Sequence, residues 1–141
     1  MSDPAATRVA SELRLALGRL VRRVRAESGV PLGQLAVLGL LDREGPHTTS
    51  DLAAAQRVRH QSMARTVGQL VALGLVAQAP HASDRRKTVL SITAAGRARL
   101  EDERTRRVDW LAAAIEDELA PEELRALERG IELLARLARV R

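Results

Sequence analysis

Positively charged side chains gather in one short part of this sequence, and their chemistry is that of anion binding. Residues 56–87 carry six basic side chains and a single acid, Asp84. The basic residues are Arg57, Arg59, Arg65, Arg85, Arg86 and Lys87. They account for the whole formal net charge of +5, because acids and bases balance in the rest of the chain. Such a localised basic patch is typical of a polyanion-binding protein, and a solvated charged face is the alternative.

Side chains that could carry out catalysis or hold a metal do not form a recognisable group. The histidines His47, His60 and His81 are scattered along the chain. No glycine-rich phosphate loop follows a strand-like run, and no nucleophile–base pair is visible. The acidic residues at 116–118 and 122–123 surround a helix boundary, where carboxylates cap helices or face solvent. We therefore expect no enzyme, no metal site and no cofactor.

The composition is that of one globular domain without covalent staples. The chain of 141 residues is 45% hydrophobic and 29% charged, which is enough to bury a core. It has no cysteine, so disulfides and thiolate metal sites are excluded. Trp110 is the only aromatic residue, which argues against an RNA-binding surface that stacks bases on rings. With no membrane-length apolar run and no secretory signal, we expect a cytoplasmic protein without a membrane partner.

The spacing of apolar residues predicts a mainly α protein with a small β-hairpin, an α+β fold. Apolar positions three and four apart predict helices at 8–27, 32–43, 48–55, 61–73, 94–119 and 121–137. Two short β-capable runs, 75–79 and 88–92, flank a polar loop and predict the hairpin as the only β-structure. Thr48 and Asp51 have the spacing of a capping box, and Gly74 is well placed to end the helix before it.

The order of these elements predicts a winged helix-turn-helix over residues 32–96, with the wing at about 75–92. The second helix of such a pair has the diameter to enter the major groove, where base edges present distinct donors and acceptors. Its N-terminal N–H groups also suit phosphate. We therefore expect DNA contacts from Arg57, Arg59, His60, Gln61, Ser62, Arg65, Arg85, Arg86 and Lys87.

The helices at both ends carry apolar stripes that the central elements cannot all cover. These helical regions span residues 8–31 and 97–141. The most economical cover is a second copy of the chain, so we expect a dimerisation region there. Folding of these helices back onto their own chain is the alternative.

Three stretches resemble the multiple-antibiotic-resistance regulator (MarR) family. They are residues 50–53 (Ser-Asp-Leu-Ala), residues 65–76, and Asp84-Arg85-Arg86 leading to residues 92–96 (Ile-Thr-Ala-Ala-Gly). The last fits the family's wing pattern of Asp-x-Arg, five residues, an aliphatic residue, Thr, two residues and Gly. The helix order also matches, so the resemblance covers nearly all of residues 1–141 as one domain.

The resemblance implies a homodimeric transcriptional regulator that binds a pseudo-palindromic operator in double-stranded DNA, a repressor relieved by a small ligand. It implies that the helix from Gln61 reads the major groove and that Arg86 and its neighbours contact the minor groove. It also implies that Asp84 structures the wing by holding an arginine through a charge-assisted bond.

Members of this family respond to small phenolic or other anionic effectors bound between the dimer region and the DNA-reading lobe. Arg14, Arg22, Arg107 and Trp110 are the candidates for such a pocket here. A core tryptophan with solvated arginines is the alternative.

Two positions depart from the family pattern. Arg57 or Val58 stands where the turn between the reading helices often has glycine, and a non-glycine residue at positive φ carries strain. Ala64 stands where the recognition helix often has Thr or Ser. Two other functions remain open: an architectural DNA binder without sequence preference, and a winged-helix module that docks an acidic protein.

Overall fold

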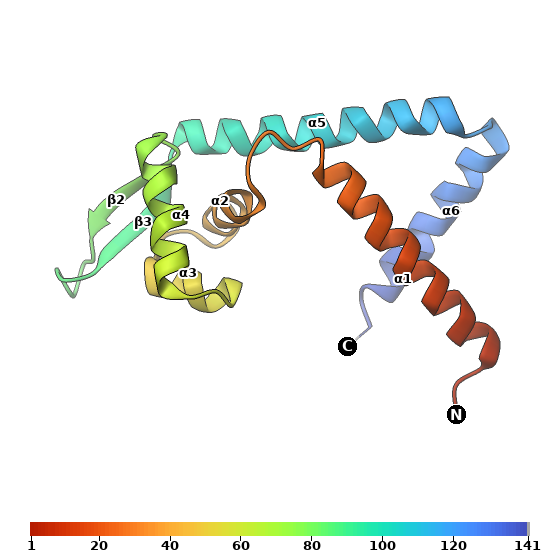
Figure 1. Cartoon of the computed structure of the whole chain (residues 1–141), viewed down its shortest axis with the longest axis horizontal. Helices are drawn as coiled ribbons and strands as arrows, with labels where there is room; N and C mark the ends of the chain where they lie inside the picture. Colours follow the sequence, from red (N-terminus) through yellow and green to blue (C-terminus); the bar gives the residue numbers. More distant parts are fainter. Residues whose placement is uncertain (141) are drawn as a thin grey trace.

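The structure, a computed structural model, describes residues 1–140 as a helical protein with a small antiparallel sheet (Figure 1). The helices are α1 (Pro4–Arg25), α2 (Leu32–Glu44), α3 (Thr49–Gln56), α4 (His60–Ala72), α5 (Ala94–Glu118) and α6 (Pro121–Leu137). The strands are β1 (His47–Thr48), β2 (Val76–Pro80) and β3 (Thr88–Ile92). In this described part of the chain no helix is long and apolar enough to cross a membrane.

The sheet has one strand more than the sequence predicted. Its order is β1-β3-β2, with Val76 opposite Ile92 in the hairpin and His47 opposite Leu90 at the other edge. The expectation that the hairpin was the only β-structure is therefore wrong. A strand of two residues is too short to show any alternation of apolar and polar residues, which is why the sequence did not predict it.

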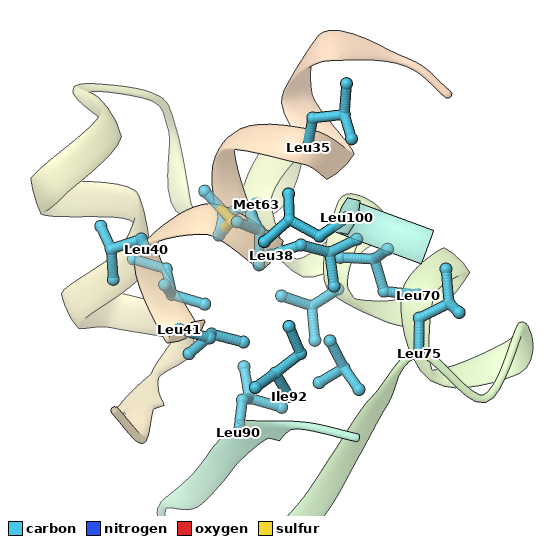
Figure 2. Packing of buried hydrophobic residues seen from close by; sticks show 14 of the residues in the cluster. Leu35, Leu38, Leu40, Leu41, Met63, Leu70, Leu75, Leu90, Ile92 and Leu100 are labelled. Carbon is cyan, nitrogen blue, oxygen red and sulfur yellow. The ribbon is translucent and has the colours of Figure 1, made fainter. Parts of the chain in front are cut away.

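Helix α2 lies at the centre of the compact lobe formed by α2, α3, α4 and the sheet. It is apolar around most of its circumference, and Val37, Leu38 and Leu41 are almost fully buried. Figure 2 shows Leu38 and Leu41 among side chains from α4, β3 and the start of α5, including Leu70, Leu90 and Leu100.
The lobe thus has a single hydrophobic core to which α2, α3, α4, β2 and β3 all contribute.

Local signals in the sequence set the ends of these helices. Thr48 Oγ1 accepts from the Asp51 N–H at 3.1 Å, and Asp51 Oδ2 accepts from the Thr48 N–H at 3.2 Å, which confirms the capping box. Gly74 has a φ of 73° and ends α4, as expected. Helix α1 begins at Pro4, before the first expected apolar position, because Asp3 caps it and Pro4 occupies its first turn.

The base of the wing is locked to the first turn of α5. Thr93 Oγ1 donates to the Gly74 carbonyl at 2.7 Å and accepts from the Gly96 N–H at 3.0 Å. A Cβ built on Gly96 would lie 2.2 Å from the Leu75 carbonyl oxygen, so only glycine permits this approach. The Thr-x-x-Gly part of the wing pattern therefore has a direct packing reason.

Helices α1 and α6 leave the lobe with their apolar faces uncovered. Helix α5, about 37 Å long at 1.5 Å per residue, runs from the lobe to the end of the molecule where α1 and α6 lie (Figure 1). Within the described residues neither α1 nor α6 contains a buried side chain. The exposed apolar residues are Val9, Leu15, Leu17, Leu20 and Val21 on α1, and Leu124, Leu127, Ile131, Leu133 and Leu137 on α6.

The turn between α3 and α4 contains a strained residue. Arg57 has a φ of 54°, the left-handed conformation, where the family often has glycine. The side-chain Cβ makes this conformation cost about 1–2 kcal/mol relative to glycine.

We predict that Arg57→Gly raises the free energy of unfolding by about 0.5–1 kcal/mol, because the relieved strain exceeds the entropy gained by the unfolded chain. The measurement is the urea midpoint at unchanged slope. Arg57→Ala is the matched control, since it removes the same charge but keeps the Cβ and should give no stabilisation.

Candidate nucleic-acid interface

Helix α4 presents a polar face to solvent because its other face is committed to the core. Met63, Val67 and Leu70 are buried, at spacings of four and three residues. Gln61 and Arg65 are exposed. An exposed face of this kind on the second helix of a helix-turn-helix is free to enter a groove.

The start of α4 offers unpaired backbone donors. Its N-cap residue, Arg59, makes no side-chain capping bond, so the N–H groups of the first turn have no capping acceptor. His60, Gln61 and Ser62 occupy this turn and are exposed, together with Arg57 just before it. Free N–H groups and the positive end of the helix dipole both favour phosphate at this end of the helix.

A histidine and an aspartate shape the tip of the wing. His81 Nδ1 accepts from the N–H groups of Ser83 at 3.1 Å and Asp84 at 3.2 Å. Asp84 Oδ1 in turn accepts from the Arg86 N–H at 3.1 Å and lies 3.5 Å from Arg86 Nε. The Arg86 side chain is 95% exposed, so Asp84 orients it without withdrawing it from solvent. The acceptor role of His81 was not predicted, because nothing in the spacing of one histidine distinguishes it from a surface residue.

A groove of about 290 Å³ brings the helix and the wing together. Its lining residues are Thr48, Thr49, Ser50, His60, Ala64, Arg86, Lys87 and Thr88. It therefore brings His60 from α4 close to Arg86 and Lys87 from the wing. The start of α3 also lines the groove, and sequence reasoning missed this contribution. Arg85 instead lines a separate shallow hollow of about 190 Å³ with Gln78 on the wing.

Most of the cations predicted to bind DNA form no ion pair with an acid in the described part of the chain. Arginines on α1, α5 and α6 form ion pairs, such as Arg8 with Glu12 and Arg129 with Glu132. In the part of the chain that the structure describes, the pair of Asp84 with Arg86 is the only such contact among the predicted DNA-binding side chains. The surplus charge found in the sequence is thus a surplus on the surface.

The capping box at the start of α3 lowers the pKa of Asp51. The hydrogen bond from the Thr48 backbone N–H lowers the pKa of Asp51 below its ordinary value of 3.8, helped by the Thr48 side chain and by the charges of His47 and Lys87. The stabilisation from this carboxylate is therefore fully present above the unfolded value and is lost as the pH falls through the lower folded value. The start of α3 is capped at neutral pH.

The residues proposed for an effector pocket are only partly brought together. A hollow of about 420 Å³ between α1, α2, α3 and α5 is lined by Arg107 and by Arg25, which the sequence did not single out. The Nε of Arg107 is buried and has no hydrogen-bond partner among the described residues. Trp110 lies apart, with its ring centroid 4.7 Å from the Arg23 guanidinium. Arg14 and Arg22 are exposed on α1 and do not line this hollow.

Comparison with known proteins gives one consistent result. A sequence model of the MarR family matches residues 28–87. An HTH-type transcriptional regulator of Mycobacterium bovis is 40% identical over 108 residues, covering 74% of this chain and 76% of that protein. The crystal structure of a proposed transcriptional regulator from Pseudomonas aeruginosa is 32% identical, with a TM-score of 0.82 and 99% of each chain covered. A mutant of MepR from S. aureus, bound to an oligodeoxyribonucleotide, has the same fold at 18% identity and a TM-score of 0.68, covering 92% of this chain and 97% of its own.

We predict that Arg86→Ala weakens binding to every duplex by about tenfold and lowers the salt slope by about one, because a wing arginine contacts features common to all sequences.

We expect Gln61→Ala to change mainly which sequence is preferred, at about 1–3 kcal/mol for the affected base pair. Gel shifts on specific and scrambled duplexes measure both effects, with Arg8→Ala on α1 as the control. An unchanged sequence preference in Gln61→Ala would show that α4 does not read the major groove.

Proposed function

Because the chain belongs to the MarR family of helix-turn-helix, DNA-binding transcriptional regulators, we propose that it is a homodimeric repressor. In this proposal the dimer binds a pseudo-palindromic operator in double-stranded DNA and is released by a small anionic or phenolic effector. The observation that carries the proposal is the groove in which His60 of α4 lies beside Arg86 and Lys87 of the wing, within a stretch of the chain that holds the whole net positive charge.

This surface has the two kinds of group that operator binding requires. Exposed Arg86 and Lys87 on the wing suit the phosphate backbone or the minor groove, which position a protein on the duplex. Gln61 and Arg65 on the outer face of α4 suit adenine and guanine edges, which specify sequence. A protein with both kinds of group is expected to bind its operator more tightly than random DNA.

The uncovered faces of α1 and α6 support the homodimer. Large apolar side chains such as Leu20 and Ile131 are about half exposed in the single chain, at 47% and 56%. Contiguous apolar faces on a soluble protein mark an interaction surface. A second copy would bury them and would present two DNA-reading lobes related by a two-fold axis, matching an operator with two related half-sites.

The hollow beside Arg25 and Arg107 supports an anionic effector. Arg25 and Arg107 both line the hollow, and an arginine guanidinium pairs with a carboxylate or phenolate through charge-assisted hydrogen bonds. The hollow is lined by α1 and α5 as well as by α2 of the lobe. A ligand that binds one arrangement of these helices more tightly would shift the population of DNA-binding dimers.

The function is tested by selecting duplexes from a random pool with the purified protein. We expect a recovered motif with two inverted half-sites about one helical turn apart, bound at least about a thousandfold more tightly than scrambled DNA. Recovery of no motif, with a steep salt dependence, would indicate an architectural DNA binder. Absence of duplex binding at modest salt would leave the protein-docking function.

The homodimer is tested by analytical ultracentrifugation at micromolar concentration. We expect a dimer for the native chain and a monomer for Ile131→Glu, because a charge placed in the proposed interface would have to be desolvated without a partner. Glu128→Gln, on the same helix, is the control and should remain dimeric. A native chain that sediments as a monomer would contradict the proposal.

A further inference from the structure

The buried carboxylate of Glu103 holds the linker between α1 and α2 against helix α5. None of the residues predicted to bind DNA takes part in this contact. We propose that this contact, the Glu103 clasp formed by Glu103 with Ser28 and Gly29, sets the spacing between the two DNA half-sites that the dimer accepts. Glu103 is thus a positioning residue. The inference rests on the proposed operator-binding homodimer and adds to it the element that makes its geometry selective.

The clasp is short and sheltered from water. Glu103 is 1% exposed, and its Oε2 accepts from the Ser28 hydroxyl at 2.8 Å and from the Gly29 N–H at 3.3 Å. Arg106 Nη1 lies 3.9 Å from Oε1 and supplies the opposite charge. Burying a carboxylate is unfavourable unless it is paired and hydrogen-bonded, so the contacts of Glu103 with Ser28, Gly29 and Arg106 depend on one another.

Ser28 is committed to the carboxylate. Its hydroxyl has one proton, and it lies 2.8 Å from Glu103 Oε2 and 3.0 Å from the Val30 carbonyl. The shorter, charge-assisted contact takes the proton. A Cβ at Gly29 would make an ordinary contact of 3.4 Å with Glu103 Oε1 and would require only the end of the Arg106 side chain, at 2.7 Å, to move aside.

The clasp lies where the lobe meets the terminal helices. On the linker side it is followed at once by Val30, which is buried in the core of the lobe. On α5 it comes three residues after Leu100, which is also buried in that core. Further along the same two helices, the Arg23 guanidinium stacks on Trp110. The linker and α1 itself are therefore each held against α5 at one point, which constrains the direction of α1 relative to the lobe.

This direction influences where the second lobe lies in a dimer. The terminal helices form the proposed dimer contact, so any rotation of α1 about the α1–α2 linker, relative to the lobe and α5, changes the distance and angle between the two copies of α4. One base pair inserted between half-sites moves them by about 3.4 Å and roughly a tenth of a helical turn. A rigid clasp would restrict binding to one spacing, and a loosened clasp would tolerate several.

The test uses the full-length protein and synthetic duplexes that carry the selected half-sites at spacings from two base pairs shorter to two longer. We expect the native chain to lose about tenfold or more in affinity per base pair of change, through the cost of deforming protein or DNA. We expect Glu103→Gln and Ser28→Ala to flatten this profile to within about threefold, with binding to a single half-site unchanged.

Two controls separate positioning from loss of fold. Glu101→Gln, on the exposed side of the same helix and paired with Arg104, should keep the native spacing profile. Ser28→Ala removes only one hydroxyl. It is therefore the variant to measure if Glu103→Gln lowers the urea midpoint so far that its DNA binding cannot be tested. A native profile in Ser28→Ala, or an equal loss at all spacings in a folded variant, overturns the inference. If the native chain binds no duplex selectively, the proposed function itself fails.

Discussion

The burial of α2 on nearly all sides is the constraint from which the rest of the lobe follows. A helix with Val37, Leu38 and Leu41 in the interior has to be covered by α4, the sheet and the start of α5. Helix α4 covers it with its one apolar stripe, which forces the polar side of α4 outward. The exposed polar face of α4 is therefore a consequence of core packing, and its side chains can change without a change of fold.

The acidic and basic side chains at that surface have different orientations. Two carboxylates beside it, Asp51 and Asp84, are turned toward backbone N–H groups of their own segments and order those segments. The arginines and the lysine of the wing are left to face solvent. Like charges gathered in this way repel one another in the free protein, and a polyanion removes that repulsion on binding.

Sequence alone predicted the elements whose signals are local and repeated. The stripe of α4, the capping box at Thr48, the left-handed Gly74 and the helix order all follow from spacing within a few residues. The features it missed depend on contacts between distant segments. Strand β1 exists because two residues meet β3, Arg25 reaches a hollow with Arg107, and Glu103 meets a linker 74 residues away. The spacing of residues within one segment carries no information about contacts between distant segments.

The lock between Thr93, Gly74 and Gly96 has a mechanical meaning. Because the end of α4, the base of the wing and the first turn of α5 share hydrogen bonds and a backbone contact with no room for a Cβ, they have to travel as one rigid block. Helix α5 therefore cannot change direction at its first turn without moving the end of α4 and the base of the wing together with it.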